Sequence, residues 1–246
     1  LVDFRAIRQQ VPKATINDQF LCIVGGALHA YLSAKKELPD TSMVAMVPMT
    51  LRGQEKGGDV GNQVGFTLMP VHSEIEDPLE RLRAICDAAA TSKRVTDAIG
   101  KELARDLLET LPSIVADPLL RNVQTPRIGL IVSNVRGPDV PLYMAGAQLV
   151  NYAPISIALD GMGLNVTAFS YAGHMWICAV SCREMLPDPS FFADCLRAAF
   201  EQMKEAAARE AAFTVADTAA LAPAENGRTI EGKVARKQAR RRVQGK

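Results

Sequence analysis

Three short segments of this chain hold the polar side chains whose types and spacing could do chemistry. They are Thr15-Ile16-Asn17-Asp18, Ser133-Asn134-Val135-Arg136-Gly137-Pro138 and Asp160-Gly161-Met162-Gly163-Leu164-Asn165-Val166-Thr167. The first opens an expected helix, the second ends an apolar strand, and the third leads into another. Asn165 lies inside an apolar strand, where an amide must find a hydrogen-bond partner. It could donate towards a ligand or satisfy another group of the chain, and the sequence leaves both interpretations open.

The chain offers no evident proton-transfer group. Its three histidines, His29, His72 and His174, are never adjacent, and no carboxylate that would orient any of them is identifiable from the sequence. A general base needs such positioning as well as a pKa near neutrality. The five cysteines are scattered, with neither zinc-ligand spacing nor the pairing of a secreted scaffold. We therefore expect free thiols in a reducing cytoplasm, no metal site and no general base.

The bulk composition is that of an ordinary globular protein. The 246 residues are 48% hydrophobic and 22% charged, with a formal net charge of +1. That charge gives no global attraction to nucleic acid or to an anionic membrane, and no apolar run approaches the roughly 18 to 20 residues that span a bilayer. The polar start at Leu1 shows no signal peptide and no initiator Met. We expect a cytoplasmic chain that is a fragment, a processed product or one subunit of a split enzyme.

The elements that must position these residues follow from periodicity and capping signals. Thr15 with Asp18 fits a capping box for a helix over about 17–34, and Asp77-Pro78 starts another. The apolar patterns predict strands over 43–51, 64–71, 128–133, 164–171 and 175–182, further helix over 101–111, and a last helix from 189. Ala172-Gly173 is consistent with a hairpin turn between the last two strands. Together these elements predict an α/β (α+β) two-layer sandwich with a mixed sheet.

Two further features concern packing and domain limits. Gly25 and Gly26 inside the first helix should each cost about 1 kcal/mol relative to Ala, so another backbone is expected to pass close by. Residues 1–212 are expected to form one domain and residues 213–246 a disordered basic tail. The tail could bind anionic lipid or simply be solvated. It has no aromatic residues to stack on bases beyond about Asn226, which argues against nucleic acid.

In this order and with these gaps, the three segments resemble the C-terminal half of the bacterial wax ester synthase/diacylglycerol acyltransferase family. Pro48-Met49-Thr50-Leu51-Arg52 and Asp77-Pro78-Leu79-Glu80-Arg81-Leu82 are similar to two further motifs of that family. The resemblance covers about residues 3–207. It implies one half of a chloramphenicol acetyltransferase-like fold, in which two αβ domains surround a substrate tunnel. The family's HHxxxDG motif is missing, and its paired histidines would have to stand where this chain has Ile155 and Ser156.

The resemblance implies transfer of an acyl group from acyl-CoA to a diacylglycerol or long-chain alcohol. A histidine of the absent motif would take the hydroxyl proton, so the N-terminal catalytic half is the implied partner and this chain alone is expected to be inactive. Acyl-CoA is implied as a co-substrate, with no cofactor. Contact with a membrane or lipid-droplet surface would suit such substrates.

In that family context we expect substrate-binding roles for Asn17, Asp18, Ser133, Asn134 and Asn165. Asn17 would face the tunnel with Asp18 bracing it, although both could simply cap the helix. Ser133 and Asn134 could form tunnel wall or only a turn. Arg52 could hold a CoA phosphate or end its strand in solvent.

The alternative interpretation is a non-catalytic scaffold or interaction domain that keeps the acyltransferase fold. It predicts a polar surface and a well-behaved monomer. The acyltransferase interpretation predicts instead a large apolar surface left uncovered in the isolated chain.

Overall fold

The computed structural model describes residues 1–50, 64–99, 128–159 and 161–221. Four helices and seven strands are described in those ranges, in the order α1 (Val2–Gln10), α2 (Ile16–Lys35), β1 (Val44–Thr50), β2 (Val64–Pro70), α3 (Pro78–Ile99), β3 (Ile128–Arg136), β4 (Tyr143–Met144), β5 (Ala147–Gln148), β6 (Leu164–Tyr171), β7 (His174–Ser181) and α6 (Pro189–Leu221).

Five of the strands form one mixed sheet in the order β2-β1-β3-β6-β7. Strand β1 is antiparallel to β2 and parallel to β3, β3 is parallel to β6, and β6 is antiparallel to β7. Strands β4 and β5 form a separate two-stranded hairpin. The expected α/β class with a mixed sheet is confirmed.

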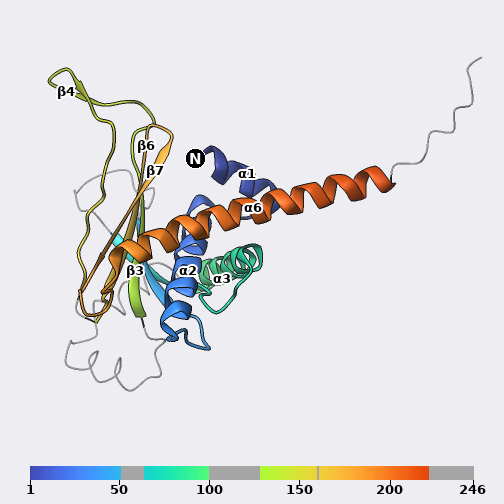
Figure 1. Ribbon diagram of the computed structural model, residues 1–246, viewed down its shortest axis with the longest axis horizontal. Helices are drawn as coiled ribbons and strands as arrows, with labels where there is room; N and C mark the ends of the chain where they lie inside the picture. The colour runs from blue at the N-terminus through green and yellow to red at the C-terminus, as the bar shows by residue number, and fades with distance from the viewer. Residues whose placement is uncertain (51–63, 100–127, 160, 222–246) are drawn as a thin grey trace, which may run out of the picture. The chain divides into compact units, whose positions relative to one another are not determined.

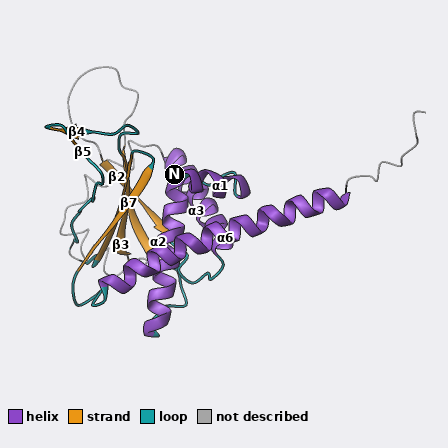
Figure 2. Cartoon of the chain, turned by 45° about the horizontal axis from the view of Figure 1, so that its top comes forward, coloured by secondary structure: helices purple, strands orange, loops and turns teal. Residues whose placement is uncertain are grey.

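The helices pack against one face of the five-stranded sheet (Figures 1 and 2). The residues of β6 and β3 that point to that face, such as Val166 and Val132, are fully buried in one apolar core with Phe20 of α2 and Phe192 of α6. Two compact units are distinguished, Leu1–Glu210 and Ala211–Lys246, and the sheet and this core belong to the first. The opposite face of the sheet is therefore not covered by these helices, and connecting segments can pack against it.

Helix α2 begins and ends with clear local signals. The Thr15 side chain accepts a hydrogen bond from the backbone N–H of Asp18, and the Asp18 carboxylate accepts one from the Thr15 N–H at 2.8 Å. The expected capping box is confirmed. At the other end Lys36 adopts a left-handed φ of 60° and closes the helix through Ser33 and Leu32.

A close backbone approach explains Gly25. A Cβ on this residue would stand 2.0 Å from the carbonyl oxygen of Val71, which allows no side chain at all. The side chain of Arg81 packs against Gly25 and Gly26 and donates to the backbone carbonyls of His72 and Glu76. The 71–77 loop is thus fastened to α2, as the glycine pair predicted.

Most element limits agree with the sequence, and the differences lie at the ends and in the connections. The Ala172-Gly173 hairpin is confirmed, with φ of 47° and 84°. Helix α1 and the β4–β5 hairpin were not expected. The helix predicted over 101–111 lies outside the described residues. Helix α6 continues to Leu221, and residues 222–246 lie outside the described range, so the expected division at residues 212 and 213 stays a prediction. In the described part of the chain, no helix is both long enough and apolar enough to cross a bilayer.

Candidate functional site

The face of β6 that points away from the helices carries the central candidate residue. Side chains alternate along a strand, so Asn165, Thr167, Phe169 and Tyr171 share this outer face, while Val166 and its even-numbered neighbours enter the core. The extended chain between the β4–β5 hairpin and β6 returns along this face (Figure 1). The candidate site is therefore the layer between β6 and that returning segment.

Asn165 is fully hydrogen-bonded within this layer. Its Nδ2 donates to the Ser156 hydroxyl at 3.1 Å and to the Ile157 carbonyl oxygen at 2.8 Å. Its Oδ1 accepts from the Thr167 hydroxyl at 2.8 Å. Because both amide hydrogens are used, Asn165 holds the returning segment against the sheet. A direct contact between Asn165 and substrate stays a prediction.

Ser133 lies beside this network and Asn134 does not. In the parallel register Ser133 is opposite Thr167 and Asn134 is opposite Ala168. Residues paired in register point the same way, so Ser133 shares the outer face with Asn165 and Thr167, and Asn134 points to the helix face. Both side chains are half-buried near the end of β3. The structure thus brings Ser133 and Asn165 to one face and separates Asn134 from them.

Asn17 and Asp18 belong to the opposite layer. Both lie in the first turn of α2, which packs on the helix face of the sheet (Figure 2). The buried Asp18 carboxylate is used by the capping box, accepting from both the N–H and the hydroxyl of Thr15. Asn17 is half-buried. These two residues do not share a face with Asn165, and their expected contact with substrate stays a prediction. Arg52 lies outside the described residues.

Tyr171, which the sequence did not single out, holds the β4–β5 hairpin. Its hydroxyl accepts a hydrogen bond from the Leu142 N–H at 2.7 Å and donates to the Leu149 carbonyl oxygen at 2.9 Å. Phe169, on the same face, stacks on Tyr152 with ring centroids 4.1 Å apart. The alternation along β6 could have indicated this role, since Phe169 and Tyr171 share the phase of Asn165.

His72 has the orienting carboxylate that the sequence did not reveal. Its Nδ1 lies 2.9 Å from Glu74 Oε1, and the residue adopts a left-handed φ of 48°. The pair forms because the Ser42 hydroxyl accepts from the His72 N–H and Arg81 fixes the following carbonyls. His72 and Glu74 follow β2, outside the layer on β6. His29 is used structurally, with Nδ1 2.8 Å from the Ser73 carbonyl oxygen.

The cysteines are free, and the buried ones are poor nucleophiles. Burial raises the pKa of the Cys22 thiol to about 12, against a smaller opposing effect of the nearby Arg81 guanidinium. Burial likewise raises the pKa of Cys86 to about 11. Thiols with such pKa values stay protonated near neutral pH and supply no thiolate. Within the described ranges, no group of three or more His, Cys, Asp or Glu could hold a metal ion.

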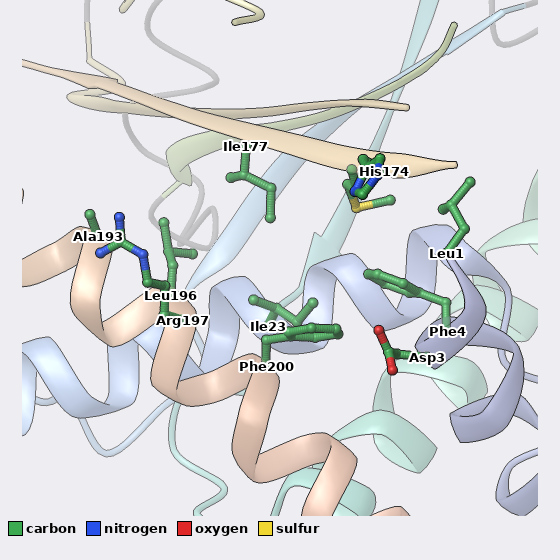
Figure 3. Close-up of a pocket in the computed structure, with 11 residues that line it drawn as sticks. Leu1, Asp3, Phe4, Ile23, His174, Ile177, Ala193, Leu196, Arg197 and Phe200 are labelled. Atoms are coloured by element: carbon green, nitrogen blue, oxygen red, sulfur yellow. The ribbon is translucent and has the colours of Figure 1, made fainter. Parts of the chain in front are cut away.

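A separate cavity of about 380 Å³ opens at the edge of β7 on the helix side of the sheet. Figure 3 shows Ile177 of β7 facing Ile23 and Phe200 of the helices across it, and His174 lies at the start of β7 at its rim. None of the candidate substrate-binding residues lines this cavity. Two charged side chains, Asp3 and Arg197, line it, and Arg197 is paired with Asp194 at 2.7 Å in solvent. The candidate site remains the layer on β6. This layer holds the returning segment and carries hydroxyl and amide groups, but no general base is found in it among the described residues.

Comparisons with known proteins agree with this arrangement. Residues 60–204 match the model of the WS/DGAT C-terminal domain. The chain is 34% identical over 190 residues to O-acyltransferase WSD of Acinetobacter baylyi, covering 75% of this chain and 40% of that protein. It is 34% identical over 182 residues to a probable diacylglycerol O-acyltransferase of Mycobacterium tuberculosis, covering 73% of this chain and 40% of that one. The chain therefore spans about 40% of the length of these relatives.

Two solved structures show the same architecture. The wax ester synthase/diacylglycerol acyltransferase of Marinobacter aquaeolei VT8 superposes with a TM-score of 0.69 at 26% identity, covering 85% of this chain and 47% of that one. The epimerization domain of tyrocidine synthetase B superposes with a TM-score of 0.50 at 16% identity, covering 82% of this chain and 44% of that one, which shows a shared fold alone. The matched residues, the fold and the relatives together place this chain in the wax ester synthase/diacylglycerol acyltransferase family, as its C-terminal domain.

Proposed function

We propose that this chain is the C-terminal domain of a long-chain O-acyltransferase. The complete enzyme would move an acyl group from acyl-CoA to a diacylglycerol or a long-chain alcohol, making triacylglycerol or wax ester. The observation that carries the proposal is the 34% identity to O-acyltransferase WSD over 75% of this chain. The order of the Asn17-Asp18, Ser133–Pro138 and Asp160–Thr167 motifs is consistent with it.

The proton transfer would be performed outside this chain. Attack of an alcohol on a thioester needs a base within hydrogen-bond reach of the hydroxyl, and such a base contributes about a hundred- to ten-thousandfold. His29 is bonded to the main chain, and His72 follows β2 outside the β6 layer. His174 is exposed at the start of β7, opposite Tyr171 and six residues along β6 from Asn165. The histidine motif of the family's N-terminal half would supply the base, so this chain by itself would be inactive.

The contribution of this chain would be to shape and line the path of the substrates. The β6 layer presents the hydroxyls of Ser133 and Thr167 beside the returning segment that Asn165 holds. Asn17, at the start of α2, and Arg52, as a partner for a CoA phosphate, are the further candidates from the sequence. No cofactor besides acyl-CoA as co-substrate is required by this chemistry.

The direct test is acyl transfer from palmitoyl-CoA to hexadecanol and to dipalmitoylglycerol, followed by thiol release. It is run on this chain alone and on a fusion in which the N-terminal part of the Acinetobacter relative precedes Leu1. Activity of the fusion with silence of the single chain supports the proposal, and the preferred acceptor names the substrate. Turnover by this chain alone would show that the assignment of the base is wrong. A monomeric chain, with both preparations silent, would favour the scaffold alternative.

A peripheral contact with a membrane or lipid droplet would suit insoluble substrates, and the basic residues beyond Asn226 are the candidates for it. Each cation near an anionic surface contributes roughly 1 kcal/mol. Liposome binding that is sensitive to salt and lost on deletion of residues 226–246 supports this role. Binding that survives the deletion would exclude the tail as its cause.

A further inference from the structure

The cavity at the edge of β7 has apolar walls that come from four different elements. Ile177 of β7, Ile23 of α2 and Leu196 of α6 line it. Phe4 of α1 lines it too and stacks on Phe200 of α6, with ring centroids 5.5 Å apart. Figure 3 shows these side chains around one common space. None of them carries a hydrogen-bonding group, so these walls attract a ligand through dispersion and the hydrophobic effect alone.

The volume of the cavity limits the size of that ligand. Its 380 Å³ falls near the lower end of the roughly 300–1,000 Å³ that small-molecule sites occupy. At about 30 Å³ for each water-sized group, it holds on the order of a dozen non-hydrogen atoms. A diacylglycerol with two long acyl chains is far larger than that. One aliphatic chain of medium length fits, and an apolar cavity takes up such a chain in preference to water.

Polar side chains stand at the two ends of the cavity. Figure 3 shows Arg197 at one end and Asp3 with His174 towards the other, and all three residues are exposed. The Asp3 carboxylate can accept a hydrogen bond, and the His174 imidazole can donate or accept one. The end with Asp3 and His174 therefore suits a hydroxyl group, which is both a donor and an acceptor.

The charges at both ends already have opposite charges beside them. Arg197 is paired with Asp194 at 2.7 Å. The pKa of Lys204 is raised, chiefly by its hydrogen bond to Glu201 and also by the charge of Asp3, so the Asp3 carboxylate has a cation nearby. Neither end thus leaves a free cation for an anionic head group or a free anion for a cationic one. The rim favours a ligand whose head group is polar and uncharged.

We propose that this cavity is a lipid-binding site, separate from the β6 layer, for one medium-length aliphatic chain that ends in a hydroxyl group. The chain lies between Ile177 and the stacked rings of Phe4 and Phe200, with its hydroxyl at the end that carries Asp3 and His174. The cavity is on the helix side of the sheet, whereas the β6 layer is on the outer face. Its occupant is therefore a different molecule from any substrate in that layer. The proposal rests on the cavity and not on the proposed acyl transfer.

The first test measures binding of three probes to this chain by equilibrium dialysis. The probes are 1-decanol, decanoate and decyltrimethylammonium, which share one chain length and differ in the charge of the head group. We expect saturable binding of one decanol per chain, about tenfold or more tighter than binding of either charged probe. Absence of saturable decanol binding overturns the proposal. A charged probe that binds as tightly as decanol overturns it as well.

A pair of alanine variants on α6 tests the place of binding. Ala193 lines the cavity, whereas Ala198 is exposed and does not line it. Ala193→Phe fills the cavity and should weaken decanol binding about tenfold or more, and Ala198→Phe should leave it unchanged. Circular dichroism confirms that both variants are folded. Equal affinities of the two variants overturn the proposal.

Photo-crosslinking tests the same position without any substitution. The probe is a decanol analogue with a diazirine at the end of the chain opposite the hydroxyl, and the labelled residues are found by peptide mass spectrometry. With the hydroxyl beside Asp3 and His174, the diazirine reaches the other end of the cavity, so we expect labels on Ala193, Leu196 or Arg197. Labels on the β6 layer, or labels scattered over the surface, overturn the proposal.

The fusion with the N-terminal part of the Acinetobacter relative separates a ligand from a protein segment as the occupant. Decanol binding to the fusion is measured without acyl-CoA, and only the part that Ala193→Phe removes is assigned to the cavity. Binding kept in the fusion supports the proposal. Binding lost in the fusion means that protein placed before Leu1 fills or closes the cavity, and it overturns the proposal. A fusion that binds decanol here but transfers no acyl group retains the lipid site and rejects the enzymatic proposal, whereas an active fusion without this binding does the reverse.

Discussion

The side-chain amide of Asn165 donates to the carbonyl oxygen of Ile157 at 2.8 Å, joining the outer face of β6 to the segment that crosses it. Asn165 is buried, and a buried amide needs hydrogen-bond partners of its own. The bond therefore fixes the course of the chain just before β6. It also gives a structural reason for an amide inside an apolar strand. The sequence pattern showed that the amide is there but not which group it bonds.

Replacing this amide should destabilise the domain. Asn165→Leu keeps the number and branching of the side-chain heavy atoms but leaves the Ile157 carbonyl and the Ser156 and Thr167 hydroxyls without this partner, and we expect a loss of about 1–3 kcal/mol in unfolding free energy. Thr167→Val is the matched control, because it removes one of the three bonds, with an expected loss of about 0.5–1.5 kcal/mol. Urea unfolding measures both. Asn165→Leu with unchanged stability would contradict the network, and a raised KM for acyl-CoA in a stable fusion would assign Asn165 a role at the substrate.

Variants at Asn17 and at the nearby Thr15 distinguish a role in substrate contact from a role in helix capping. Thr15→Ala removes the capping hydroxyl, and we expect it to cost about 1 kcal/mol in stability with little change in the KM of the active fusion. Asn17→Ala leaves the capping box intact, so it should preserve stability. If Asn17 contacts substrate, the same variant lowers kcat/KM several-fold. Wild-type kinetics of Asn17→Ala would remove Asn17 from the candidate site.

Much of the fold was predictable because its signals are local. The Thr15–Asp18 capping box, Pro78 at a helix start and the period-two pattern of β6 and β7 each involve neighbours in sequence. Gly25 was informative because its cost in a helix required a compensating contact. Helix α1 escaped notice because its N-cap is Leu1, which makes no side-chain capping bond.

The β4–β5 hairpin shows where such signals end. Its turn at Ala145-Gly146 has φ of 48° and 82°, nearly the same as the recognised Ala172-Gly173 turn, but the strands it joins are only two residues each. So short a hairpin has no periodicity to detect. Which candidates share a face also depended on strand register, which pairs Ser133 with Thr167 and places Asn134 on the opposite, helix-facing side of the sheet. Register is set by tertiary packing as well as by pattern.

The contact between Gly25 and Val71 predicts a large effect from a small substitution. In Gly25→Ala the added Cβ would stand 2.0 Å from the Val71 carbonyl oxygen, so α2 and the 71–77 loop must separate. We expect a net loss of about 2 kcal/mol or more, although the alanine itself favours helix by about 1 kcal/mol. Gly26→Ala is the control in the same helix, since its nearest atom, Arg81 Nη1, ends a side chain. A Gly25→Ala protein as stable as the control would show that the loop does not press on α2.

Thiol reactivity should follow burial. Cys182 is exposed, while Cys22 is buried with its Sγ 3.2 Å from the Pro78 carbonyl oxygen. At pH 8 we expect an aromatic disulfide reagent to modify Cys182 within the mixing time and Cys22 at least a hundredfold more slowly. In denaturant all five cysteines should react alike. Rapid modification of Cys22 in the native protein would contradict its burial beneath α3.

The buried Cys22 thiol also makes stability depend on alkaline pH. Burial raises its pKa from 9.0 to about 12, so the folded protein keeps the proton that the unfolded chain releases. The stabilising contribution is complete below pH 9 and falls as the pH rises towards 12, by about 2 kcal/mol at pH 10.5. Urea unfolding at pH 8 and pH 10.5 is compared with that of Cys22→Ala, which shares every other titrating group. The wild-type protein should lose more stability than the variant between the two pH values, and equal losses would mean that the Cys22 thiol ionises as readily in the fold as in the unfolded chain.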